Sequence, residues 1–193
     1  MAVSPKAFGC VNNTIRLRSG RYLDLADPKP DQFTFMDIAG ALSKICRFGG
    51  QINLFYSVAE HCVHCTNQGC RDGLPLDTQA ALLMHDAAEA FIGDMVKPLK
   101  IMLPGYDEVE KKMEAAIAEK FLIDFDRESY SVHKIDQEML IAERVALFSR
   151  DDVVWTGERD VRKLSIRFEC WEPNQSEIQF CKMARQIGLN ISE

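Results

Sequence analysis

Residues 82–95, LLMHDAAEAFIGDM, place four ionisable side chains in an apolar stretch. The surrounding aliphatic and aromatic residues leave almost no polar face, which predicts a helix buried in the core. We expect it to begin at Asp77 or Thr78 and to end at Gly93. Because an unpaired carboxylate inside a core is costly, the ionisable groups must be paired, protonated or bound to a metal ion. These groups are His85, Asp86, Glu89 and Asp94.

The composition indicates an ordinary globular protein. A chain of 193 residues with 47% hydrophobic residues suits a single domain, 1–193, with a sizeable core. The net charge of −6 argues against duplex nucleic acid as the main partner. No apolar run approaches the roughly 20 residues that span a bilayer, and the N-terminus lacks the layout of a signal peptide. We therefore expect a cytoplasmic protein without a membrane partner.

The seven cysteines are an odd number in a chain without a secretion signal, which indicates reduced thiols rather than a disulfide framework. The stretch HCVHC, residues 61–65, offers an alternative, because Cys62, Cys65 and Cys70 could hold a structural zinc ion. A C-x2-C pair usually needs a second pair to close a tetrahedral site, and the sequence holds no second pair at this spacing.

Apolar residues at helical spacing predict an all-α fold of about six helices. Beside the core helix, we predict helices at 38–45 after Asp37 as the cap, 57–68, 106–122, 131–149 and 176–188. Residues 14–35 alternate polar with apolar side chains and predict a short extended N-terminal arm with a hairpin. We expect a loop at 96–107, which holds two prolines, and a long loop or a short helix at 150–166.

The core helix holds two neighbouring candidate metal ligands. His85 and Asp86 precede Glu89 by four and three residues, so the three side chains project from one side of a helix. A histidine and an aspartate suit a divalent cation, but two ligands do not close a site. We expect His61, on the preceding helix, and Asp136, whose helix turns that side toward the core, to complete it.

The order His61, His85-Asp86, Asp136 resembles the H…HD…D signature of the HD-domain metal-dependent phosphohydrolases. Flanking blocks such as DIAGALSKICRFGG, FYSVAEH, MHDAAEAFIGDMVKPLK and VHKIDQEMLIAER also resemble, in the same order, those of small HD hydrolases of bacteria and phages. The resemblance covers residues 19–148. It implies an HD-domain helical bundle in which these four residues bind one divalent cation, with Co²⁺, Mn²⁺, Mg²⁺ and Zn²⁺ as candidates.

The resemblance also implies catalytic residues. Glu89 and Asp94 match the acidic pair that follows the HD dipeptide in 5′-deoxynucleotidase-like members. Metal-bound water is more acidic than bulk water, and a nearby carboxylate can orient it or accept its proton. We assign water orientation to Glu89, which is nearest the metal ligands. Asp94 is expected to be a general acid or base, with an ordinary loop carboxylate as the alternative.

Substrate contacts follow from the same resemblance. It assigns the phosphates to Arg47 and Lys100, with solvated surface charge as the alternative for each. Phe48 stands where related 5′-deoxynucleotidases carry a tryptophan against the sugar, which would select deoxyribose. Pro98 lies where related enzymes bring a proline near the base.

The expected activity is hydrolysis of a deoxynucleotide. The sequence is similar to the dATP triphosphohydrolases of phages that replace adenine by 2-aminoadenine, which release deoxynucleoside and triphosphate. The alternative is a 5′-deoxynucleotidase acting on monophosphates, but Lys97 and Lys100 together favour the longer phosphate chain. A non-catalytic HD scaffold that senses nucleotides is a third alternative. The resemblance further implies a homo-oligomer and, for a phage protein, the cytoplasm of the host cell.

Overall fold

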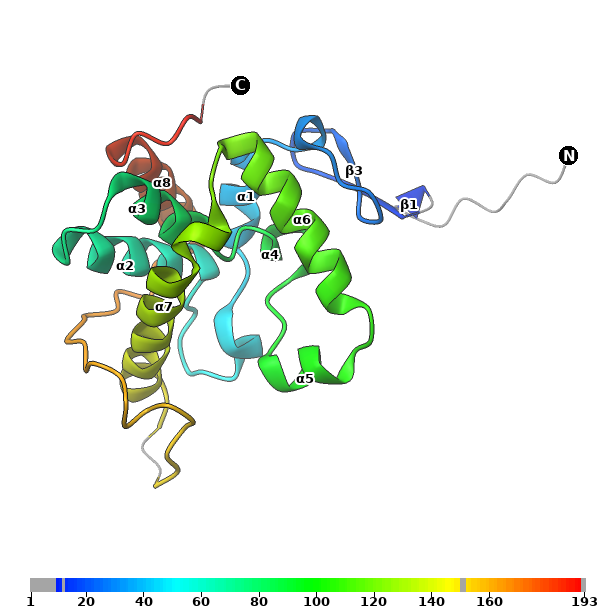
Figure 1. Ribbon diagram of the computed structural model, residues 1–193. Helices are drawn as coiled ribbons and strands as arrows, with labels where there is room; N and C mark the ends of the chain where they lie inside the picture. The colour runs from blue at the N-terminus through cyan, green and yellow to red at the C-terminus, as the bar shows by residue number, and fades with distance from the viewer. Residues whose placement is uncertain (1–9, 12, 150–151, 192–193) are drawn as a thin grey trace, which may run out of the picture.

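The computed structural model describes residues 10–11, 13–149 and 152–191. The described residues are mostly α-helical, which confirms the predicted fold class. Figure 1 shows the helices gathered into one body, with a small sheet at its edge. The α-helices are α1 (Phe35–Leu42), α2 (Val58–Arg71), α3 (Leu76–Met84), α4 (Glu89–Ile92), α5 (Lys97–Met102), α6 (Tyr106–Phe121), α7 (Phe125–Leu147) and α8 (Pro173–Gln186).

The N-terminal arm forms a small antiparallel sheet. Its strands are β1 (Cys10–Val11), β2 (Thr14–Arg16) and β3 (Tyr22–Asp24), in the order β1-β2-β3. The predicted hairpin is therefore present between β2 and β3, with Ile15 opposite Leu23. Leu23 is fully buried and belongs to the main core, so burial of this side chain attaches the sheet to the helices. A 3₁₀ turn, Pro30–Gln32, then leads toward α1.

The cap of α1 differs from the prediction. Thr34, not Asp37, precedes the first turn, and its hydroxyl accepts a hydrogen bond from the Asp37 amide at 3.0 Å. Asp37 closes a capping box, because its carboxylate accepts from the amide and the hydroxyl of Thr34 at 2.9 and 2.7 Å. It also accepts from the amide of Ser19 at 2.8 Å. One buried carboxylate thus joins the N-terminal arm to α1.

Asp37→Asn is expected to lower the free energy of unfolding by about 1–2 kcal/mol at neutral pH, because charge-assisted hydrogen bonds become neutral ones. Burial alone would raise the pKa of Asp37, but the hydrogen bonds from Thr34 and Ser19 outweigh burial and lower it. The stabilisation is therefore complete above the pKa of the unfolded chain, about 3.9, and is lost as pH falls through the folded pKa. Urea unfolding across this range, with the exposed Asp31→Asn as control, checks the effect; equal stability at neutral pH would contradict it.

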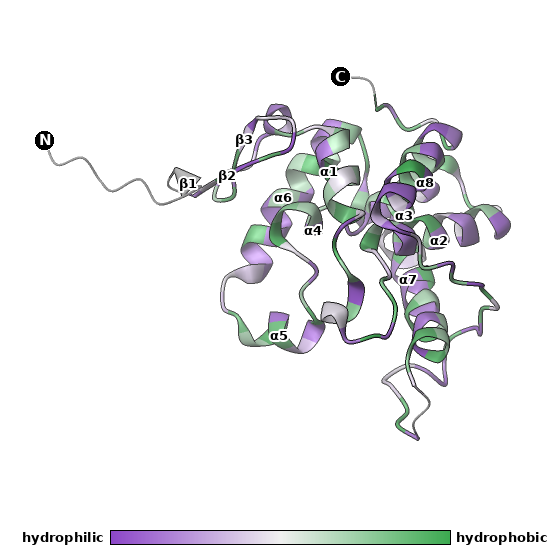
Figure 2. Ribbon diagram, turned by 180° about the vertical axis from the view of Figure 1, so that it is seen from behind, coloured by the Kyte–Doolittle hydropathy of each residue, from purple (hydrophilic) through white to green (hydrophobic). Residues whose placement is uncertain are grey.

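Helix α2 packs against α3, α7 and α8 and forms the centre of the bundle. It begins after Ser57, as predicted, and the Ser57 hydroxyl accepts from the Glu60 amide at 3.1 Å. The buried Glu60 carboxylate instead accepts from the amides of residues 169–171 at 2.7–3.1 Å. This carboxylate holds the segment before α8 against α2. Figure 2 shows polar and apolar bands alternating along α2 and α8, as expected for helices with one buried side.

Two predictions about the middle of the chain were wrong. The expected continuous core helix is divided into α3 and α4, although it ends at Gly93 as predicted. Around residues 85–88 the backbone bonds link residues three apart, including Ala87 to Met84 and Glu89 to Asp86. Such 3₁₀-like tightening often marks a functional position. The expected loop at 96–107 contains α5. Its first turn accommodates Pro98, because a backbone N–H at this position has no acceptor within the helix and its absence in proline costs no hydrogen bond.

The remaining helices lie where they were predicted, but α7 begins six residues earlier than expected, at Phe125, and α1 and α8 each begin three residues earlier. Between residues 152 and 166 the structure has turns and irregular backbone but no helix, which selects the loop of the two alternatives. None of the helices among the described residues is both long and apolar enough to cross a membrane.

Candidate metal centre

Three segments bring the four predicted ligands together. His61 lies on α2, His85 and Asp86 lie in the turn between α3 and α4, and Asp136 lies on α7. The Nε2 atoms of His61 and His85 are 3.2 Å apart. Each of these nitrogens lies within 3.8 Å of both carboxylates: His61 is 3.6 Å from Asp86 and 3.2 Å from Asp136, and His85 is 3.4 and 3.8 Å from them.

These separations fit a divalent cation. Ligand atoms about 2.0–2.2 Å from one ion lie roughly 3–3.5 Å from one another in tetrahedral or octahedral arrangements. Imidazole nitrogens and carboxylate oxygens are common ligands of such ions. A second sign is Glu89, whose Oε2 atom is buried without a hydrogen-bond partner. The histidine, aspartate and cysteine side chains of this region could therefore hold a metal ion.

The hydrogen bonds of the two rings leave their Nε2 atoms available. Nδ1 of His85 lies 2.8 Å from the carbonyl oxygen of Leu82, so Nδ1 carries a hydrogen and donates it. Nδ1 of His61 donates in the same way to Oε1 of Glu143, at 2.5 Å. In a neutral imidazole the other nitrogen then carries the lone pair. In the neutral rings, both lone pairs therefore lie on the nitrogens that face each other and the two aspartates.

The sequence interpretation missed Glu143. Its carboxylate is fully buried and also accepts from the Tyr56 hydroxyl at 2.8 Å and from the Arg47 guanidinium at 3.1 Å. Burial would raise the pKa of Glu143, but Arg47 and His61 outweigh it and lower the pKa, so the group is ionised. A signal was present: Glu143 lies seven residues, or about two turns, after Asp136 and therefore on the same side of α7.

Glu143→Gln is expected to weaken metal binding by about 10–100-fold, because carboxylates that orient a ligating histidine have effects of this size. Competition with a metal-sensitive dye measures the affinity. Glu138→Gln is a matched control, since Glu138 is also buried on α7 but pairs with Arg162 at 2.7 Å. Equal affinities in the Glu143→Gln variant and the wild type would contradict an orienting role.

Glu89 and Asp94, the predicted catalytic pair, lie beside the cluster. Burial, Asp86 and Asp94 raise the pKa of Glu89 to about 10. The Asp94 carboxyl is half-buried, and burial raises its pKa although Arg47 opposes this. Both pKa values reflect charges of the cluster, so the two carboxyls share its electrostatic environment.

Arg47 and Lys100 occupy different surroundings. Arg47 is 8% exposed, and its terminal nitrogens contact Asp86 at 3.3 Å and Glu143 at 3.1 Å. The alternative of a solvated surface charge is thus wrong for Arg47. Lys100 is partly exposed, pairs with Glu110 at 2.7 Å and lies 3.8 Å from Glu89. Both cations flank the cluster.

Phe48 belongs to an aromatic group next to Arg47. Its ring lies edge-on to Phe148 and Trp155, with centroids 5.0 and 6.4 Å away, and 5.3 Å from the Arg47 guanidinium. The Phe48 backbone has a φ of 59°, which is uncommon for a residue other than glycine. Pro98 is exposed in the first turn of α5, outside the buried cluster.

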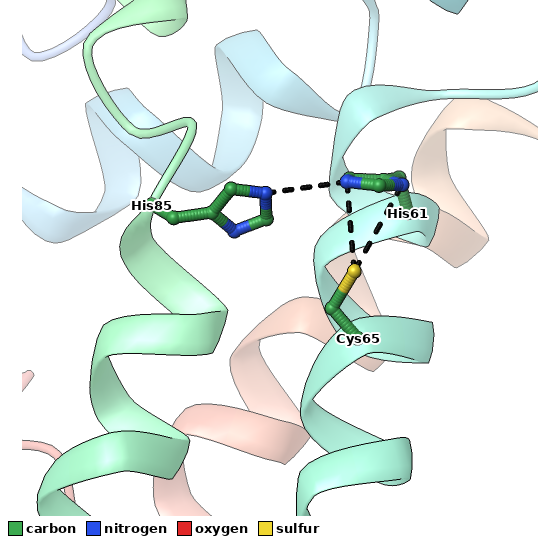
Figure 3. Close-up of side chains that lie close together, drawn as sticks. All are labelled: His61, Cys65 and His85. Atoms are coloured by element: carbon green, nitrogen blue, oxygen red, sulfur yellow. Dashed lines mark hydrogen bonds between the residues drawn. The ribbon is translucent and has the colours of Figure 1, made fainter. Parts of the chain in front are cut away.

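Two cysteines also reach the cluster. Figure 3 shows Cys65 beneath the ring of His61, with His85 pointing toward the same ring. The Cys65 sulfur is 3.5 Å from Nε2 of His61, and ligand atoms of Cys62, His85 and Asp86 lie within 4.8 Å of one another. Cys70, by contrast, is exposed and contacts Gln79 at 3.1 Å. The three cysteines of the alternative zinc site are therefore not gathered into one cluster.

Comparison with known proteins places the chain among uncharacterized relatives. No family model matches it. It is 38% identical over 111 residues to the uncharacterized protein RCAP_rcc00048 of Rhodobacter capsulatus, which covers 55% of this chain and 57% of that protein. It is 38% identical over 141 residues to the uncharacterized protein YfdR of Escherichia coli (strain K12), covering 73% of this chain and 76% of YfdR. The chain belongs to the YfdR family.

Proposed function

We propose that this chain is an HD-domain metal-dependent phosphohydrolase that cleaves a deoxynucleoside triphosphate, with dATP as the substrate, into deoxynucleoside and triphosphate. The observation that carries the proposal is a cluster of two imidazoles and two carboxylates. The Nε2 atoms of the two histidines are 3.2 Å apart, and each lies within 3.8 Å of both carboxylates. The four residues are His61, His85, Asp86 and Asp136. The order of these residues along the chain resembles the HD signature.

The proposed reaction needs a nucleophilic water, neutralisation of phosphate charge and a proton for the leaving oxygen. A divalent cation at the cluster would supply the charge neutralisation and make a water more acidic. Water oxygen forms the new bond to the α-phosphorus, the bond from that phosphorus to the 5′ oxygen breaks, and the 5′ oxygen takes a proton. Glu89 orients the water, and Asp94 serves as the acid or base that moves the proton.

Cationic side chains near the cluster support phosphate binding. Nε of Arg47 is buried and has no hydrogen-bond partner, while the other guanidinium nitrogens are held by Asp86 and Glu143. Such a donor suits a phosphate oxygen. Lys100, on the α5 side, offers a mobile point charge that would exchange part of its pairing with Glu110 for a phosphate.

Aromatic side chains support binding of the nucleoside. Phe48, Phe148 and Trp155 make edge-on contacts with one another beside Arg47, and aromatic rings of this kind stack on sugars and bases. Phe48 is proposed to pack against the 2′ carbon, which would exclude a ribose hydroxyl. This role makes the enzyme selective for deoxynucleotides.

Product analysis tests the proposed function. Purified protein is incubated with dATP, dAMP or ATP, each with Co²⁺, Mn²⁺, Mg²⁺ or Zn²⁺, and the products are separated by anion exchange. Deoxyadenosine and inorganic triphosphate from dATP, with ATP intact, are the expected products. Phosphate released from dAMP alone would replace the proposal with a 5′-deoxynucleotidase, and no product from any of the three substrates would favour a nucleotide-sensing scaffold.

A further inference from the structure

The cluster contains more potential ligands than the two histidines and two aspartates. Cys62 and Cys65 are both fully buried on α2, three residues apart, so their side chains point to the same side of the helix. His61 precedes Cys65 by four residues and shares that side. Neither thiol has a role in the proposed hydrolysis.

The two thiols lie next to different histidines. The ligand atoms of His61, Cys65 and His85 lie within 4.8 Å of one another, and so do those of Cys62, His85 and Asp86. The Cys65 sulfur lies 3.5 Å from Nε2 and 4.0 Å from Nδ1 of His61, so it sits against the ring face (Figure 3). A rotation about the Cα–Cβ bond is therefore needed to bring this sulfur to an ion held by Nε2.

The two histidines are thus shared by two sets of ligands. With Asp86 and Asp136 they form a nitrogen and oxygen set, which suits Mn²⁺ or Mg²⁺. With Cys65 they form one group of neighbouring ligand atoms, and Cys62 lies next to His85, so the four side chains are of the types found in Cys2His2 zinc sites. Thiolates prefer soft cations and carboxylates prefer hard ones, so the two sets select different ions.

We propose that Cys62 and Cys65, with His61 and His85, form a second binding site for a thiophilic cation such as Zn²⁺ or Cd²⁺, which excludes the ion bound through the aspartates. Each thiol that binds releases one proton to solvent. Since both sets use the same nitrogens, only one ion can be held by both histidines at a time. The site itself does not depend on the proposed function. If the chain is the proposed hydrolase, a thiophilic cation bound at this site inhibits hydrolysis.

Cadmium and manganese titrations of the metal-stripped chain test the inference. Bonds between Cd²⁺ and thiolate sulfur absorb in the ultraviolet, so the first equivalent of Cd²⁺ is expected to produce this band in the wild type. The Cys62→Ser/Cys65→Ser double variant should lose the band and bind Cd²⁺ more weakly by at least about tenfold, the lower end of effects at metal sites. Cys181→Ser is the matched control, because Cys181 is buried on α8 and should leave the band unchanged.

The outcomes separate this inference from the proposed function. A wild type without the sulfur band, or a double variant that keeps it while its circular dichroism spectrum is native, would overturn the second site. If Mn²⁺ binds, detected by electron paramagnetic resonance, and Cd²⁺ displaces it, both donor sets are supported. Mn²⁺ binding that survives saturation with Cd²⁺ would overturn the competition. A sulfur band together with failure to bind Mn²⁺ would support the cysteine site and count against the proposed hydrolase.

Discussion

Replacing Asp86 with alanine is expected to abolish stoichiometric Mn²⁺ binding and, under the proposed function, to lower dATP hydrolysis by at least about 10³-fold. Metal ions contribute several kcal/mol of charge stabilisation to such reactions, and each 1.4 kcal/mol corresponds to about a factor of ten. Asp86 faces both imidazoles, at 3.6 and 3.4 Å, so its loss removes an oxygen ligand from the set of two imidazoles and two carboxylates.

The measurement is metal content by mass spectrometry after equilibration with Mn²⁺ and gel filtration, together with initial rates. Asp77→Ala is a suitable control, because Asp77 is exposed in the first turn of α3. Circular dichroism shows whether each variant is folded. If the wild type and Asp86→Ala hold equal amounts of Mn²⁺, Asp86 is not a ligand and the proposed centre is wrong.

Arg47→Ala is expected to lower the free energy of unfolding by about 3–5 kcal/mol, because it leaves the buried Glu143 and the partly buried Asp86 without their counter-charge. Arg47 is buried, and its two terminal nitrogens contact Asp86 and Glu143 separately. Arg47→Lys should recover only part of the loss, since one ammonium group lacks the planar fork that reaches both carboxylates. In the variant, Tyr56 and His61 still donate hydrogen bonds to Glu143, which limits the loss of unfolding free energy to this range.

Urea unfolding at neutral pH measures this loss. Arg127→Ala is the control, because Arg127 is mostly exposed and its pair with Glu128, at 3.4 Å, is of the surface kind. Surface pairs contribute about 0–1 kcal/mol. A change for Arg47→Ala no larger than that of Arg127→Ala would show that the guanidinium does not stabilise the buried carboxylates.

Local sequence patterns predicted the helices well because helix formation depends largely on residues close together in the sequence. Apolar residues at helical spacing and the Ser57 cap depend on neighbours within a few residues, and α2 begins where that cap predicts. The same reasoning failed where a local preference was overridden. An uninterrupted apolar run predicts one helix, but the backbone tightens into turns at residues 85–88 and divides it. The two prolines in 96–107 predicted a loop, but this segment contains α5.

The candidate site was predictable in part. Residue order and the resemblance to HD-domain proteins pointed to His61, His85, Asp86 and Asp136, and the structure brings these side chains together. The role of Glu143 was missed. Its position on the same side of α7 as Asp136 was a local signal, but the contact that gives Glu143 its role is with His61, 82 residues away in the sequence.

The sequence by itself determined the all-α class, the ends of several helices and the identity of the candidate ligands, because periodicity, capping and residue order are properties of the chain. Only the tertiary structure decided that Arg47 is buried between Asp86 and Glu143 and that Cys65 lies against His61. Arg47 and Glu143 are 96 residues apart. Such contacts depend on the angles and distances at which α2, α3 and α7 pack, and packing is set by the whole core rather than by any one segment.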